Sequence, residues 1–391
     1  MPSGHSAALS VADVLRDHVA ELFLDRDQAR AAAHILACRT GRLGGHVAVC
    51  TTCGAHSFAY HSCRDRHCPR CGGLDQALWA EAQLPHLLPV SYFHVVFTLP
   101  ARLRFFFARH PDRTRARADA LNALFAAVAE TLLEAAATTG IRIGILAVLH
   151  TWNQRLDSHP HIHCLVPGGG LSPSGFVQRR RFLLPLRVLR PLFKGKLLSK
   201  LQALLRDGGA AVVNASGHEL LRDAARHNWN IHIRRPFAGP EQVVQYFARY
   251  TRRIAISDRR LLHYDGHNVT FRCRDPKNHR RSLRVRIDAS TFARRFLNHV
   301  LPSRFVRIRR YGILANRVRE KALLAARESL HADPPQLLAP QGESRSAACL
   351  RIFQWDPERC PDCGQDTLLV LVTWKPRLHG SFMPQTLPRP P

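Results

Sequence analysis

The chain has 391 residues, which at roughly 100–200 residues per domain predicts two or three domains and excludes a single small module. Lys and Arg total 57 against 29 Asp and Glu, so the formal net charge is +28 with histidine neutral. Such a charge is unusual for a metabolic enzyme and indicates a polyanionic partner such as nucleic acid. Hydrophobic residues make up 46% and charged residues 22%, which are ordinary globular values that exclude wholesale disorder.

The basic excess is mostly arginine, the side chain whose planar guanidinium grips phosphates. No run of about 18 apolar residues occurs, and the N-terminal residues lack the basic-then-apolar order of a signal peptide. These features predict a soluble intracellular protein without membrane segments.

The first part of the chain predicts helices followed by a cysteine-rich stretch. Residues 11–40 have apolar positions at helical spacing and predict two short helices. Residues 44–73 have short β-like runs between cysteines and too little apolar content for a core of their own. A bound metal is the expected source of stability for this stretch.

Eleven cysteines occur in the chain, several of them in C-x-x-C pairs, which in a reducing compartment predict metal ligands and not disulfides. Two pairs separated by fourteen residues predict one tetrahedral structural Zn²⁺ site. Its four thiolates are those of Cys50, Cys53, Cys68 and Cys71. Cys63 and His67 lie between the pairs and remain alternative ligands or members of a second partial site.

Residues 91–100 predict a strand, 113–137 a helix, 143–153 and 159–170 two further strands, and 190–206 a basic helix. This order predicts an α+β fold with a central antiparallel sheet. Farther on, the pattern predicts a helix that begins after Gly-Pro and four short strands, followed by an Arg-rich region ending near Ala326. The ranges are 238–252 for the helix and 254–257, 261–264, 268–273 and 282–287 for the strands.

The tail from about Pro334 is rich in proline and low in periodicity, which predicts a linker with a small appendage. It contains the lone pair Cys360 and Cys363, for which Cys349 is a weak companion by spacing. A zinc site, a remnant and a reactive dithiol all stay open for this pair.

Three histidines, His159, His161 and His163, alternate along the segment 159–170. In an extended chain all three project from the same sheet face. Clustered neutral imidazoles on one face predict a metal site, although the spacing does not identify the ion.

Tyr246 and Tyr250 stand four residues apart on a predicted helix, hence on one face about one turn apart. Such aromatic pairs usually belong to a core or an interface. These tyrosines, however, adjoin three candidate DNA-binding arginines, Arg249, Arg252 and Arg253. Beside arginines and a histidine metal site, a tyrosine can attack a phosphodiester as phenolate.

Five segments occur together in one order: CTTCGAHSFAYHSCRDRHCPRCG, HVVFTLP, LHTWNQRLDSHPHIHCLVPGGGLS, YFARYTRRIAIS and RFLNHVLPSRFVRIRRYGILAN. On these segments the chain resembles, over roughly residues 20–325, the rolling-circle insertion-sequence transposases of the IS ninety-one type, two-tyrosine relatives of the HUH endonucleases. The resemblance implies a ferredoxin-like HUH nuclease domain behind a small four-cysteine zinc-binding domain.

By this resemblance, His161 and His163 look like the pair that holds Mg²⁺ or Mn²⁺, and Tyr246 and Tyr250 look like the catalytic tyrosines. Tyr250 is the preferred nucleophile. The third metal ligand stays open among three residues, with Gln154 favoured because it precedes His161 by seven residues in a predicted neighbouring strand. The three are Gln154, His150 and His159.

The resemblance further implies a bacterial, cytoplasmic and nucleoid-associated enzyme that nicks and joins single-stranded DNA at transposon ends and target sites through a 5′-phosphotyrosine. Basic residues at 179–181, 280–286 and 304–310 would line a groove for single-stranded DNA, with Phe182 or Phe305 as a stacking platform. The expected domains are residues 1–85 (helices and zinc module), 86–326 (catalytic) and 327–391 (tail). A zinc-dependent DNA-binding protein of a decayed element and a replication initiator or relaxase remain alternatives.

Overall fold

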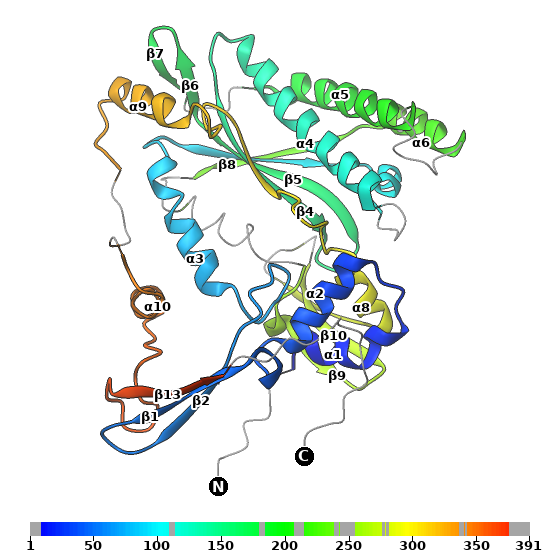
Figure 1. Cartoon of the computed structure of the whole chain (residues 1–391). Coiled ribbons are helices and arrows are strands. Elements are labelled where there is room, and N and C mark those ends of the chain that lie inside the picture. Colours follow the sequence, from blue (N-terminus) through cyan, green and yellow to red (C-terminus); the bar gives the residue numbers. More distant parts are fainter. Residues whose placement is uncertain are drawn as a thin grey trace.

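A computed structural model of the chain describes residues 9–108, 114–179, 184–206, 215–237, 255–275, 281–335 and 342–374, together with residues 242, 278 and 340. A five-stranded sheet covered by long helices occupies one end of the molecule (Figure 1). A smaller unit of helices and strands and a separate three-stranded sheet lie at the other end.

The main sheet has the strand order β12-β4-β5-β3-β8, and all neighbouring strands are antiparallel. Along the chain, helix α4 follows β3, and helices α5 and α6 lie between β5 and β8. The strands are β3 (Tyr92–Thr98), β4 (Gly144–Trp152), β5 (Ser158–Pro167), β8 (Asn230–Phe237) and β12 (Ile308–Gly312). The helices are α4 (Thr114–Ala137), α5 (Leu186–Arg206) and α6 (Ala215–Arg226). The predicted α+β class with a central antiparallel sheet is confirmed.

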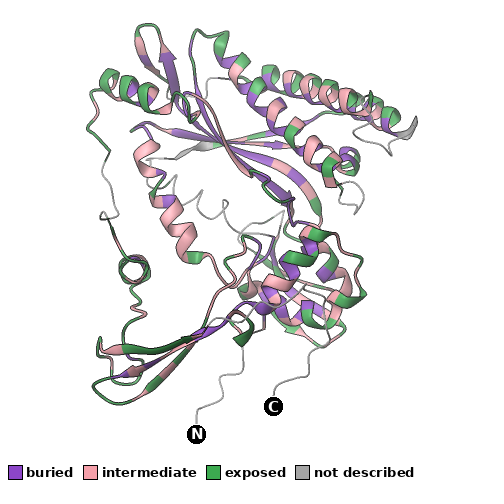
Figure 2. Ribbon diagram, in the orientation of Figure 1, coloured by how far each residue is buried: buried purple, intermediate pink, exposed green. Residues whose placement is uncertain are grey.

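The two faces of the sheet differ because side chains alternate along each strand. On β5, Ile162, Cys164 and Val166 are buried in a core shared with α4 and α5. Figure 2 shows the buried residues concentrated along these strands and the inner sides of the helices. By length and composition α4 is apolar enough to cross a membrane, but 61% of its most apolar window is buried inside the protein, as is typical of a core helix.

Among the residues that the structure describes, a core covers the opposite face toward one end. There a smaller core joins sheet residues such as Tyr92 and Leu165 to α3 (Gly73–Glu81) and α9 (Arg319–Ser329). A hairpin of β6 (Gly169–Ser172) and β7 (Gly175–Gln178) adjoins α9.

The second unit combines the N-terminal helices with strands from late in the chain. Helices α1 (Val11–His18) and α2 (Arg26–Ala37), both predicted, share one core with residues between Ala255 and Val300. The carboxylate of Asp25 caps α2 by accepting from the N–H groups of Asp27 and Gln28. The later elements are β9 (Leu261–Tyr264), β10 (Asn268–Arg274), β11 (Ser282–Asp288) and α8 (Ala289–Leu297).

One prediction from periodicity is wrong. Residues 255–257 do not form a strand, because Ala255 is buried with a left-handed φ of 44°. In the tail, for which the sequence predicts a linker with a small appendage, the structure has α10 (Arg345–Phe353) and β13 (Leu368–Trp374). Strand β13 pairs with β1 (Gly45–Cys50), which also pairs with β2 (His56–Tyr60), so the three strands form one small sheet.

Arg117 on α4 joins the two larger cores. Its guanidinium is buried and donates hydrogen bonds to the carbonyl oxygens of Phe107 (3.1 Å), Val300 (3.0 Å) and Asn298 (3.0 Å). The last two acceptors follow α8, so a single side chain links α4 to the second unit.

We expect Arg117→Ala to lower the free energy of unfolding by about 3 kcal/mol, because three buried carbonyls lose a charged donor. Urea denaturation followed by circular dichroism measures the change. Arg115→Ala, at an exposed position of the same helix, should change the free energy by less than about 0.5 kcal/mol. Equal midpoints for the two variants would contradict the linking role.

Candidate functional site

Three histidines from two neighbouring strands cluster on the face of the main sheet that points away from α4 and α5. His150 comes from β4, and His161 and His163 come from β5. One ring nitrogen from each lies within 4.8 Å of the others. The pairing of β4 with β5 produces this geometry, because His150 lies opposite His161 in the register.

Burial determines the charge of the cluster. Desolvation lowers the pKa of His161 to about 4 and holds the pKa of His163 well below its usual range. Both imidazoles are therefore neutral near pH 7 and carry the lone pair that a metal ion binds.

His94 on β3 supports this cluster from the next strand. Its Nε2 lies 2.8 Å from His163 Nδ1, and the two rings stack with their centroids 5.0 Å apart. A hydrogen bond at one ring nitrogen fixes the orientation of the other, as is usual for metal-binding histidines. The sequence analysis missed His94, although the alternation of buried Phe93 and Val95 around it places it on the histidine face.

The candidates for the third ligand lie in different surroundings. His150 belongs to the cluster. His159 Nδ1 accepts a hydrogen bond from Arg104 at 2.9 Å. Gln154 is exposed in the turn between β4 and β5, where its backbone carbonyl oxygen accepts a hydrogen bond from Arg260 at 2.6 Å. The geometry favours His150 as the third ligand.

The predicted tyrosines and arginines lie outside the described residues, as does most of the predicted helix 238–252. The residues concerned are Tyr246, Tyr250, Arg249, Arg252 and Arg253. Their roles remain predictions.

Of the two predicted stacking residues, Phe182 lies outside the described residues, and Phe305 is not an exposed platform. It is only 7% exposed and packs in the main core, with its ring centroid 6.4 Å from that of Phe125. Arg309 lies over both rings and donates to Asn122, so this arginine stabilises the fold.

The structure divides the four predicted zinc cysteines between two clusters. Cys68 and Cys71 meet Cys38, from the end of α2, and Cys63. Cys50 and Cys53 lie in another group, with Cys360 and Cys363. The expected single site is corrected in this respect, because the β1–β2 hairpin carries the first pair away from the loop that contains the second.

The first cluster has the dimensions of a zinc site. With Zn–S bonds of about 2.3 Å, a tetrahedron places its sulfurs about 3.8 Å apart. The Sγ atoms of Cys63 and Cys71 are 3.6 Å apart. His67 is engaged elsewhere, because Asp65 holds its Nδ1 at 2.9 Å and the N–H of Leu301 donates to its Nε2.

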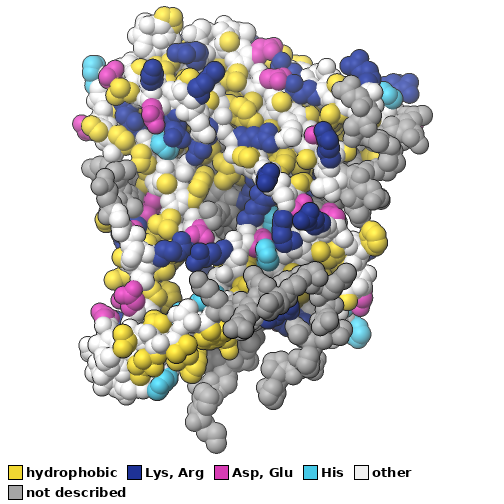
Figure 3. Space-filling view, in the orientation of Figure 1, with side chains coloured by type: hydrophobic (Ala, Val, Ile, Leu, Met, Phe, Trp, Pro, Cys, Tyr) yellow, Lys and Arg dark blue, Asp and Glu magenta, His cyan; other side chains and the backbone are white. Residues whose placement is uncertain are grey.

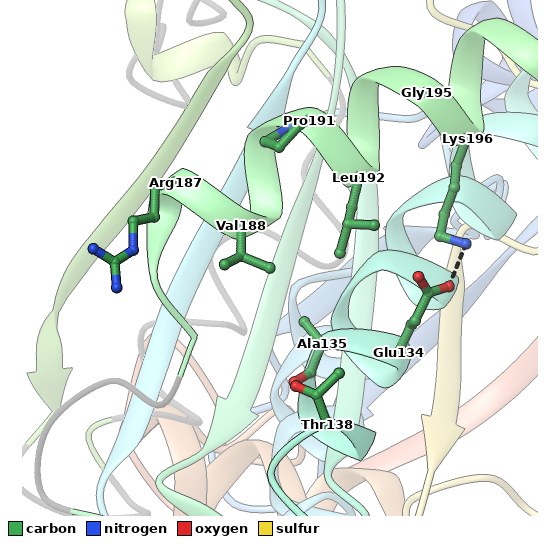
Figure 4. Close-up of a pocket in the computed structure, with 9 residues that line it drawn as sticks. All are labelled: Glu134, Ala135, Thr138, Arg187, Val188, Pro191, Leu192, Gly195 and Lys196. Carbon is green, nitrogen blue, oxygen red and sulfur yellow. Dashed lines mark hydrogen bonds and ion pairs between the residues drawn. The ribbon is translucent and has the colours of Figure 1, made fainter.

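A groove between α4 and α5 lies on the other side of the sheet (Figure 4). Its lining is largely aliphatic, with a Lys196–Glu134 ion pair of 2.6 Å at one side. No histidine, cysteine or tyrosine is among the described residues that line it.

Comparisons with known proteins agree with this arrangement. Residues 144–322 match a family model described as "Putative transposase", and residues 11–99 match one described as "Transposase zinc-binding domain". The "Putative transposase y4qJ" of Sinorhizobium fredii is 40% identical over 382 residues, covering 90% of this chain and 92% of the relative. The "Transposase for insertion sequence element IS801" of Pseudomonas savastanoi pv. phaseolicola is 30% identical over 356 residues, covering 86% and 82%.

No solved structure matches the chain. The matched ranges contain the histidine cluster and the first cysteine cluster, and both relatives extend over most of the chain. The chain thus belongs to the insertion-sequence transposases of the IS ninety-one type, with a transposase zinc-binding domain near its N-terminus.

Proposed function

We propose that this transposase nicks and joins single-stranded DNA at the ends of its insertion sequence through a covalent 5′-phosphotyrosine. The three-histidine cluster is the observation that carries the proposal. It lies within the residues that match the transposase model, on a sheet face that the long helices leave open.

The topology supports a ferredoxin-like nuclease domain of the HUH type. In chain order the unit reads β3, α4, β4, β5, α5 with α6, and β8, and its strands are arranged β4-β5-β3-β8. A ferredoxin-like fold has the same β-α-β-β-α-β chain order, with two split β-α-β units whose strands interleave in one sheet. The histidine strand is then a central strand, rigidly held on both sides.

The donor set fits a divalent ion. His161 and His163 are neutral imidazoles that would hold such an ion, with His150 as third ligand, and the resemblance to the HUH endonucleases leads us to propose Mg²⁺ or Mn²⁺. The bound ion would supply Lewis-acid withdrawal of charge from the scissile phosphate.

The covalent step is assigned to Tyr250, with Tyr246 as the second nucleophile. The tyrosine hydroxyl gives up its proton, and its oxygen forms a bond to phosphorus while the bond from phosphorus to the 3′ oxygen breaks. The departing oxygen takes a proton and becomes a 3′-hydroxyl. The reverse reaction joins a strand without an external energy source, and Arg249, Arg252 and Arg253 offset the phosphate charge.

The charge of the chain supports a nucleic-acid substrate. The net charge is +28, and Lys and Arg side chains spread over much of the face shown in Figure 3. A transposase acts on DNA, and for this one we propose single-stranded ends and target sites, reached in the bacterial cytoplasm at the nucleoid.

The test uses single-stranded oligonucleotides tiled across the DNA that flanks the gene, with Mg²⁺ or Mn²⁺ present. We expect a covalent protein–DNA band on a denaturing gel that disappears in Tyr250→Phe or the double tyrosine variant and in His161→Ala. Tyr60→Phe and His263→Ala, at exposed positions, are matched controls that should retain the band.

The absence of a band on every flanking strand, with salt-sensitive binding retained, would support the zinc-dependent DNA-binding alternative. A band only with plasmid origin strands would instead indicate a replication initiator or relaxase.

A second experiment identifies the third ligand. His150→Ala should weaken Mn²⁺ binding by about 10-fold or more, whereas Gln154→Ala and His159→Ala should change it less than about 2-fold. Electron paramagnetic resonance of free Mn²⁺ measures the affinity, and thiolate clusters do not compete for this hard ion. A loss in Gln154→Ala with normal binding in His150→Ala would reverse the assignment.

A further inference from the structure

Four cysteines from opposite ends of the chain form the second cluster. Cys50 is the last residue of β1 and Cys53 lies in the turn after it, whereas Cys360 and Cys363 precede β13. We propose that they bind a second structural zinc ion, which fastens residues 345–374 to the N-terminal hairpin. The matched zinc-binding model ends at residue 99 and contains only two of these four ligands.

The sulfur positions agree with one tetrahedral ion. The Sγ atoms of Cys50 and Cys363 are 3.6 Å apart, and those of Cys53 and Cys360 are 3.8 Å apart. The edge of a zinc–thiolate tetrahedron is about 3.8 Å. All four sulfurs lie within 4.8 Å of one another, as one shared ion requires.

The two pairs have the same local structure. Each reads Cys-x-x-Cys-Gly, and the glycines, Gly54 and Gly364, have φ values of 72° and 73°. The glycine N–H donates at 2.9 Å to the carbonyl oxygen of the first cysteine in both turns. Two matching turns therefore present their thiols toward each other, one from each end of the chain.

The small sheet has little else to hold it together. Leu369, Val370, Leu371 and Val372 of β13 are each more than half exposed, and Phe58 of β2 is 69% exposed. Figure 2 shows the same contrast, with the small sheet largely exposed beside the buried strands of the main sheet. A sheet with so little burial needs a metal or a crosslink for stability.

Ion pairs connect α10 to α3. Arg351 pairs with Glu81 on α3 and with Glu343 at 2.7 Å, and Arg345 pairs with Asp75 on α3 at 2.9 Å. Partly exposed pairs of this kind contribute only about 0–1 kcal/mol. The zinc ion would supply the anchor that these contacts lack.

The test counts the zinc that a mercurial thiol reagent releases from the purified full-length chain, because this reagent frees only thiolate-bound metal. We expect two zinc ions per chain in the wild type and one in Cys360→Ser/Cys363→Ser. Cys349→Ser is the matched control, because this cysteine belongs to neither cluster, and it should still release two.

Limited trypsin digestion tests separately whether the ion holds residues 345–374 against the N-terminal hairpin. The double variant should be cleaved within residues 345–374 at least about 10-fold faster than the wild type, while Cys349→Ser is cleaved at the wild-type rate. Wild type from which a chelator has removed both zinc ions should show the same faster cleavage within residues 345–374.

One zinc ion per wild-type chain would overturn the proposal without reference to any variant. Two ions in the double variant would overturn it equally. If the double variant fails to fold, Cys363→Ser at an exposed position and the wild-type count still decide between one site and two.

Discussion

The two-residue period of β5 is the constraint on which the site depends. Ile162, Cys164 and Val166 must face the core beneath α4 and α5, so His161 and His163, which alternate with them along the strand, must face away from it. A shift of one residue in register would bury imidazoles in an aliphatic core and expose the apolar set. The burial of hydrocarbon thus fixes the position of the imidazole nitrogens of the cluster, and β4 and β3 add His150 and His94 to the same face.

Local patterns predicted the parts of the fold that depend on local sequence. The strands of the main sheet near the histidines and the long helix α4 follow from alternation and helical spacing, and both are confirmed. Strand β12 has the sequence IRRYG, in which charged residues hide the period, so the sequence analysis did not identify it. The third ligand was ranked by distance along the chain, whereas the hairpin register places His150 opposite His161.

The grouping of the cysteines depends on contacts that spacing does not reveal. Cys68 and Cys71 obtain their partners from the end of α2 and from Cys63, while Cys53 meets a residue 307 positions later. Spacing correctly indicated clustered thiolates. Which cysteines meet depends on the pairing of β13 with β1, which brings the tail cysteines next to the N-terminal pair. The Cys-x-x-Cys-Gly pattern does not reveal this grouping, since it marks Cys68–Gly72 of the first cluster as well as both halves of the second.

The antiparallel pairing of β13 with β1 has a consequence for the newly made chain on the ribosome. Strand β1 ends at residue 50, and its partner begins at residue 368. At about 5–20 residues per second, tens of seconds of synthesis separate the two strands. During that interval the edge of β1 that later pairs with β13 has no partner strand. A prematurely terminated polypeptide would therefore keep an exposed sheet edge that is prone to aggregation and proteolysis.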